Sequence, residues 1–158
     1  MTKFDPVKLL PPLPRDYTYE EALEELDALY AQLPTVQCKG LCHDSCTVVP
    51  ASELEHRRIN ATGKSISPRM SGRTVNSLRK ARGADGPPRC PALGPLNNCT
   101  IYEDRPFICR VFGVALDLLC EHGCVAENVL PPGEARAVQA QIEQLSRHVT
   151  GVNADPAR

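Results

Sequence analysis

The sequence predicts a small, mainly α, irregular domain with short β segments and a long basic loop. Two amphipathic segments, near residues 18–33 and 132–149, carry apolar residues at helical spacing. Aromatic residues make up only 4% of the chain, and 15 Pro and 10 Gly residues interrupt regular structure. Eight of the 158 residues are Cys. Because a chain with few large apolar residues needs additional cross-links, these cysteines are the candidates for stapling the fold.

The first helix follows a Pro-rich segment without periodicity, residues 1–17, which we expect to form an extended N-terminal arm. Thr18 and Glu21 have the spacing of a capping box, which starts a helix by satisfying two backbone N–H groups. Pro34 ends that helix. Its apolar stripe, which we expect to pack in the core, consists of Leu23, Leu26, Leu29, Tyr30 and Leu33.

The middle of the chain is predicted to be mostly irregular. Residues 47–49 form a short β-like run, and a helix is expected from Ser52 to about Ala61. Residues 63–89 are rich in Gly, Ser, Pro and Arg and predict a loop, in which 75–82 is a candidate short helix. Residues 57–89 hold nine basic residues and one acidic residue, Asp85. A charge run of this kind favours a solvated face, and docking of an anionic partner is the alternative.

The second half of the chain is predicted to contain two more helices. Asp104 and Pro106 suit the start of a helix that carries Cys109. A position near a helix N-terminus, beside Arg105 and Arg110, would favour the thiolate form of Cys109. A final helix follows Pro131–Pro132 and runs to about Val149. The single domain is therefore predicted to span residues 18–150, with a frayed tail over 151–158.

The location of the protein is predicted from what the chain lacks. It contains no run of 18 apolar residues and no N-terminal apolar segment typical of a signal peptide, so we expect a cytoplasmic protein with no membrane association. A net charge of −1 argues against a globally basic nucleic-acid binder. In a reducing compartment, clustered cysteines indicate metal ligands more readily than disulfides.

The spacing of the cysteines is that of a metal-binding chain. The first three follow C-x3-C-x3-C, the last two follow C-x3-C, and the others lie nine to eleven residues apart. Four thiolates commonly hold zinc or an iron–sulfur cluster, so eight thiols suffice for two such sites. The fold is then a metal-stapled one. The candidate metal ligands are Cys38, Cys42, Cys46, Cys90, Cys99, Cys109, Cys120 and Cys124.

The thiols are also compatible with roles that involve no metal. Individual cysteines pack as small apolar side chains, and a disulfide scaffold or a thiol redox protein would use several of them. A redox role is disfavoured because the C-x-x-C spacing of reactive dithiols does not occur. Cys120 and Cys124 lie either on one helical face or in a turn at Gly123. His43 and His122 lie within cysteine clusters, where an imidazole could replace a thiolate, although a role beside the ligands is favoured.

A resemblance adds to this interpretation. Cys90-Pro91-Ala92-Leu93 and the segment from Cys99 to Phe112, which contains Ile101-Tyr102 and Arg105-Pro106 and then Cys109-Arg110-Val111-Phe112, resemble the YkgJ-like cysteine-cluster family of zinc- or iron-chelating domains. The first cluster fits less closely, because Ser45 stands where the family has a third Cys. Cys120 and Cys124 lie beyond the matched motifs, and one of them is a candidate replacement for that Cys.

The resemblance implies a cytoplasmic metal-binding protein that holds a Cys-ligated iron–sulfur cluster, of the [4Fe-4S] kind, or Zn²⁺. Its role would be electron transfer or an accessory function, and no particular enzyme activity is indicated. The alternative is a non-catalytic structural zinc module that docks a protein partner, or less favourably a nucleic acid, through basic residues 57–89. All-thiolate ligand sets suit both metals, so the residues alone do not separate iron from zinc.

Overall fold

The computed structural model describes residues 16–66 and 89–149 of the chain. Its elements are α1 (Tyr19–Ala31), the 3-10 helix η1 (Cys42–Ser45), α2 (Glu53–Ala61), α4 (Phe107–Arg110) and α5 (Pro132–Arg147). The mainly α prediction is confirmed, and β pairing in the described ranges consists of isolated bridges. Most of the predicted arm, the candidate helix over 75–82 with most of the basic loop, and the C-terminal tail lie outside the described residues.

Helices α1 and α2 each begin with a capping box. The Thr18 hydroxyl accepts a 3.2 Å hydrogen bond from the Glu21 N–H, and the Glu21 carboxylate accepts a 2.9 Å bond from the Thr18 N–H. The predicted start of the first helix is therefore confirmed. Ser52 and Glu55 make the same reciprocal pair at α2, at 3.3 and 2.7 Å. Both helices thus obtain a defined start from local hydrogen bonds.

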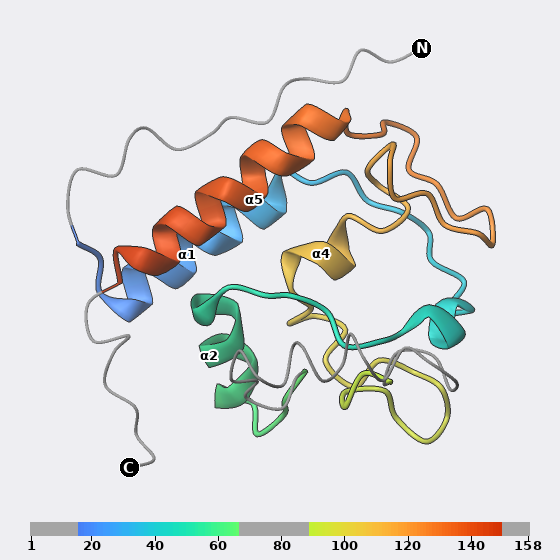
Figure 1. Cartoon of the computed structure of the whole chain (residues 1–158), viewed down its shortest axis with the longest axis horizontal. Helices are drawn as coiled ribbons and strands as arrows, with labels where there is room; N and C mark the ends of the chain where they lie inside the picture. The colour runs from blue at the N-terminus through green and yellow to red at the C-terminus, as the bar shows by residue number, and fades with distance from the viewer. Residues whose placement is uncertain (1–15, 67–88, 150–158) are drawn as a thin grey trace, which may run out of the picture.

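The main core lies between α1, α2 and α5. Figure 1 shows α1 and α5 lying side by side and running in opposite directions. Their ends are joined where the Tyr17 N–H donates a 2.8 Å hydrogen bond to the His148 carbonyl, beside a parallel bridge between Tyr17 and Val149. The predicted apolar stripe of α1 is buried in part at this interface. The fully buried side chains that fill it include Leu26, Leu29, Leu54, Val138, Ile142 and Leu145.

The cysteines lie outside the three longer helices α1, α2 and α5, in the connecting segments that include η1 and α4. In Figure 1, the segment between α1 and α2, the segment that precedes α4 and the segment between α4 and α5 gather at the right of the view. A second, smaller core supports them. Its buried members are Ile59, Ile66, Cys90, Ala92 and Ile101, with Cys46 and Cys99 packed against it.

Glu55 connects α4 to α1 and α2. Its side chain is only 4% exposed, yet it carries a carboxylate. That carboxylate accepts 2.6 Å hydrogen bonds from the Tyr30 hydroxyl of α1 and from the Phe107 N–H, in addition to the capping bond from Ser52. A buried carboxylate is tolerated when its lone pairs are satisfied in this way. Glu55 therefore fixes the start of α4, the helix that carries Cys109, relative to α1 and α2.

The second half of the chain corrects one local prediction and decides between two alternatives at another position. Helix α4 is a single turn of four residues, and its N-cap position is Pro106, with no side-chain cap. Asp104, expected to cap it, instead accepts a hydrogen bond from Arg58 at 3.4 Å. The chain between Cys120 and Cys124 turns rather than forming a helix, since the Gly123 N–H donates to the Cys120 carbonyl at 3.0 Å and Gly123 has φ +73°.

The helices in the described ranges are short and amphipathic. None of them has the length and apolar composition needed to cross a bilayer.

Candidate metal centre

All eight cysteines lie in the described ranges, and all are free thiols in the structure. They fall into two spatial groups. We call Cys46, Cys90, Cys99 and Cys109 the inner thiols, and Cys38, Cys42, Cys120 and Cys124 the outer thiols. The sequence indicated that eight thiols suffice for two sites but left the pairing open. Long-range contacts between the segments that carry the thiols indicate which of them belong to the same group.

The inner thiols are brought together by backbone pairing. The Cys90 N–H donates a 3.0 Å hydrogen bond to the Cys46 carbonyl, next to an antiparallel bridge between Thr47 and Arg89. A second bridge, between Leu93 and Cys99, turns the chain back on itself. Burial raises the pKa of Cys46 to about 11, and the neighbouring Cys90 and Cys99 thiols, followed by that of Cys42, add to the rise. Three inner thiols therefore lie within electrostatic reach of one another.

Cys109 completes the inner group from the single turn of α4. Burial raises the pKa of its thiol to about 12, and the Cys46, Cys90 and Cys99 thiols raise it further, while Arg105 opposes them. The expectation that a helix N-terminus and two arginines would favour the thiolate is therefore wrong for this structure. Burial and three neighbouring thiols outweigh one Arg. Arg110 is directed elsewhere, because its guanidinium lies 4.2 Å from the centre of the Tyr30 ring.

The outer thiols are joined by hydrogen bonds to sulfur. The Lys39 N–H donates to Sγ of Cys124 at 3.4 Å, across 85 residues, and the Gly40 N–H donates to Sγ of Cys38 at 3.3 Å. The Lys39 ammonium also donates to the His122 carbonyl at 3.5 Å. Gly40, with φ +68°, permits the tight turn that directs these amides towards sulfur.

The electrostatics of the outer thiols also link the two loops. Burial raises the pKa of Cys42, and the Cys38 and Cys120 thiols raise it further. Burial acts in the same direction on Cys120, but hydrogen bonds from the His122 and Cys124 N–H groups and from the Cys124 thiol lower its pKa overall. Amide donors of this kind stabilise a thiolate. Cys120 is thus the outer thiol best prepared to bind a cation.

The chemistry of both groups fits a thiophilic metal. Four sulfur donors suit zinc or an iron–sulfur cluster, and a bound cation removes the mutual repulsion that keeps neighbouring thiols protonated. Among the residues that the structure describes, no three His, Cys, Asp or Glu side chains are already arranged to hold a metal ion. Binding at either group would therefore require the thiol side chains to move towards a common centre.

Three polar residues beside the thiols have other partners. His43 lies 3.6 Å from the Asp44 carboxylate and His122 lies 3.7 Å from the Glu121 carboxylate. Ser45, at the position where the resembled family has a Cys, donates a 2.7 Å hydrogen bond to the Glu121 carboxylate. Ser45 therefore connects η1 to the Cys120–Cys124 turn. Sequence reasoning missed this contact because no local pattern joins residues 76 positions apart. It also missed Glu55, although Ser52 and Glu55 have the spacing of a capping box that could have singled it out.

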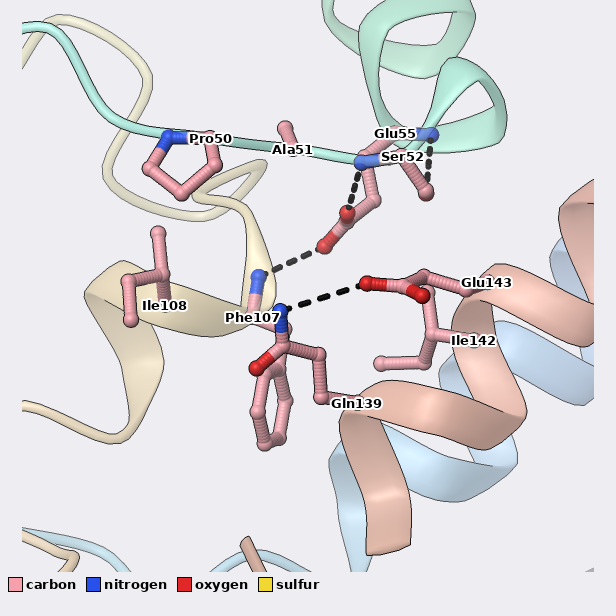
Figure 2. Close-up of a pocket in the computed structure, with 9 residues that line it drawn as sticks. All are labelled: Pro50, Ala51, Ser52, Glu55, Phe107, Ile108, Gln139, Ile142 and Glu143. Atoms are coloured by element: carbon pink, nitrogen blue, oxygen red, sulfur yellow. Dashed lines mark hydrogen bonds between the residues drawn. The ribbon is translucent and has the colours of Figure 1, made fainter. Parts of the chain in front are cut away.

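A small cavity of about 200 Å³ lies near the start of α4. Figure 2 shows Phe107 and Ile108 of α4 facing α5 across it, with the Glu55 carboxylate directed at the Phe107 N–H. On the α5 side, the Gln139 amide donates to the Glu143 carboxylate at 3.3 Å. Because its buried carboxylate is occupied in hydrogen bonds within the fold, this cavity resembles a packing gap more than a reaction site.

Comparison with known proteins bears on the cysteines directly. Residues 37–144, about two thirds of the chain, match the CxxCxxCC family, which is described as a "putative zinc- or iron-chelating domain". The chain belongs to this family. The matched region contains all eight cysteines, including Cys120 and Cys124, which the sequence motifs alone did not reach. The family supports a metal-chelating role and leaves the metal open between zinc and iron. No curated protein and no solved structure matches the chain.

Proposed function

We propose that this member of the chelating-domain family holds an iron–sulfur cluster of the [4Fe-4S] kind on its inner thiols and serves in electron transfer or as an accessory protein. The observation that carries the proposal is the convergence of Cys46, Cys90, Cys99 and Cys109. They come from three stretches of chain that backbone bridges and the Glu55 hydrogen bonds hold in place. The preference for iron over zinc comes from the family resemblance, since four thiolates suit both.

The surroundings of the inner thiols suit a cluster site. Cys90 is only 9% exposed, and the apolar side chains of Ile59, Ile66 and Ile101 pack around it. An apolar shell limits the access of water and tunes the potential of a bound cluster. A bound cluster would supply one-electron chemistry. The protein's own part would be to supply four thiolates, exclude water and hold the ligand segments at fixed positions.

A metal at this site would also stabilise the fold. The segments that carry the inner thiols form few hydrogen-bonded elements of their own, because α4 has one turn and the neighbouring pairing consists of isolated bridges. Binding four ligands from such segments converts binding free energy into folding free energy. This argument supports the metal-stapled description of the fold that the sequence suggested.

The basic segment gives less support to the competing docking function. Within the described ranges, Arg58 pairs with Asp27 at 2.5 Å and with Asp104 at 3.4 Å, and Arg89 lies 3.5 Å from Asp44. Arg58 is therefore used within the fold, whereas the Arg89–Asp44 contact lies at the surface. The pairing of Arg58 removes one basic side chain from a docking surface, and five of the nine basic residues of 57–89 lie outside the described residues.

The test is anaerobic purification followed by iron, zinc and acid-labile sulfide analysis. The proposal predicts a brown protein with broad visible absorption and equal amounts of iron and sulfide. A colourless protein with stoichiometric zinc and no sulfide would overturn the cluster assignment in favour of the zinc module. A protein with free, reversibly oxidised thiols and no metal would favour the thiol redox function instead.

A further inference from the structure

We propose that Cys38, Cys42, Cys120 and Cys124 form a second, separate four-thiolate metal site, which exchanges its metal with solvent more readily than the inner site does. The proposal rests on the proposed function in one respect, that the chain binds thiophilic metal. It goes further by assigning the remaining four thiols and by giving the two groups different accessibility.

The two loops that carry the outer thiols are held against each other at three points. The Lys39 N–H bonds to Sγ of Cys124 at 3.4 Å, the Lys39 ammonium to the His122 carbonyl at 3.5 Å, and Ser45 to Glu121 at 2.7 Å. These contacts join segments 76 to 85 residues apart in the chain. A contact this specific between two C-x3-C loops is expected where both loops serve one ligand set.

The shape of the second loop depends on a close backbone approach. Gly113 has φ +78°, and a Cβ atom at this position would lie 2.5 Å from the Cys124 carbonyl oxygen and 3.4 Å from the Cys120 Cβ. The Gly113 carbonyl accepts a 2.9 Å hydrogen bond from the Ala126 N–H. The turn that presents Cys120 and Cys124 is therefore packed directly on the chain that leaves α4, which fixes it relative to the protein body.

The two groups adjoin at η1, which begins at Cys42 of the outer thiols and is followed directly by Cys46 of the inner thiols. Each group also contains four thiols, which is the complete ligand number of a tetrahedral site or a cubane cluster. One metal centre does not require eight sulfur ligands, so a division into two sites accounts for all of them.

The outer group is accessible to solvent at Cys38. Cys38 is the one exposed thiol of the eight. Cys124 of the outer group and Cys90 of the inner group are buried, and the other five thiols are partly buried. Exposed apolar side chains also border the outer group, since Leu41 and Leu119 are each 49% exposed and Val125 is 46% exposed. A ligand thiol in contact with water can be reached by a chelator or by a competing thiol. The structure thus points to an outer site that loses its metal first.

Zinc titration of the reduced, metal-free full-length protein tests this proposal, with Zn²⁺ as the probe and a chromogenic chelator as competitor. We expect two equivalents to bind the wild-type chain and one to bind a Cys120→Ser/Cys124→Ser double variant. Cys38→Ser, a change at an exposed position, should weaken one equivalent at least tenfold without affecting the other. Binding of one equivalent by the wild type, or of two by the double variant, would overturn the second site alone.

The exchange rate provides a measurement that does not depend on any variant folding. Excess chelator added to the zinc-loaded wild type should remove metal in two phases of equal amplitude, and Cys38→Ser should accelerate only the faster phase. A single phase that releases both equivalents would contradict the difference in accessibility. Failure of the proposed function is measured separately, because it is decided by the iron and acid-labile sulfide content of the anaerobically purified protein and not by the number of zinc equivalents that bind.

Discussion

The backbone N–H of Lys39 donates a hydrogen bond to Sγ of Cys124 at 3.4 Å, although 85 residues separate the two in the chain. This bond places the first C-x3-C pair against the last one. The remaining four, the inner thiols, are Cys46 and the three cysteines of the segment that precedes and includes α4. Together with the hydrogen bond from Ser45 to Glu121, this long-range contact holds the two loops that carry the four outer thiols against each other.

Replacement of an inner thiol should remove metal and stability together. Cys99→Ser and Cys109→Ser are expected to lose the bound iron and to lower the unfolding free energy by several kcal/mol, because metal binding in small Cys-ligated domains contributes about 10–16 kcal/mol. Metal analysis and urea unfolding under anaerobic conditions measure both effects. Cys38→Ser is the matched control and should keep the inner metal. Full metal content in Cys99→Ser or Cys109→Ser would remove that residue from the ligand set.

The stability of the metal-free, reduced protein should fall at alkaline pH. Burial raises the pKa of Cys109 to about 12 and that of Cys46 to about 11, above the ordinary value of 9.0. The folded state therefore retains protons that the unfolded state loses, so this contribution is complete below pH 9.0 and disappears as the pH rises towards 12. The expected slope is about 1.4 kcal/mol per pH unit for each retained proton.

Urea unfolding between pH 8 and 11, with the metal removed and the thiols kept reduced, measures this slope. The Cys46→Ala/Cys109→Ala double variant should show a flatter dependence, since it lacks both titrating groups. An equally steep decline in that variant would show that other groups cause the loss.

The Glu55 carboxylate should contribute more to the unfolding free energy than an exposed charged side chain does. Glu55→Gln replaces a carboxylate that accepts hydrogen bonds from Tyr30, Phe107 and Ser52 by an amide with one acceptor oxygen. We expect a loss of about 1.5–3 kcal/mol in unfolding free energy. Glu53→Gln, at an exposed position on the same helix, is the control and should change stability by less than about 0.5 kcal/mol. Equal effects of the two changes would refute the connecting role of Glu55.

Gly113→Ala tests the outer loop without removing a thiol. The new methyl group would meet the Cys124 carbonyl oxygen at 2.5 Å, at a backbone φ of +78° that disfavours Ala. The turn from Cys120 to Cys124 must then shift, and zinc binding at the outer site should weaken at least tenfold. Gly133→Ala is the control, because no atom lies within 4 Å of a Cβ there. Unchanged binding of both zinc equivalents by Gly113→Ala would contradict the role of this loop.

Local sequence signals predicted the helices well. The Thr18–Glu21 capping box and the following Leu spacing define α1 within the chain itself, and the structure reproduces both. The Pro pair also marked the start of α5 to within one residue, since Pro131 is the N-cap and Pro132 is the first residue of that helix. These features depend on residues within one or two turns of each other, so the sequence contains all the information that fixes them.

Features that depend on distant residues were not predictable from the sequence. The spacing of Ser52 and Glu55 indicates a helix start, but only the fold brings the Phe107 N–H to the Glu55 carboxylate. The thiolate expectation for Cys109 was wrong because the three neighbouring thiols come from other segments. The division of the cysteines likewise follows from contacts such as Ser45 with Glu121, which no spacing rule contains.

Anomalous diffraction from crystals of the anaerobically purified protein, recorded on both sides of the iron and zinc absorption edges, tests the central assignment most directly. The account predicts an iron signal enclosed by the sulfur atoms of Cys46, Cys90, Cys99 and Cys109, with no outer thiol among its ligands. A single metal signal bound by sulfur atoms drawn from both groups, or no metal signal between the four inner thiols, would contradict it.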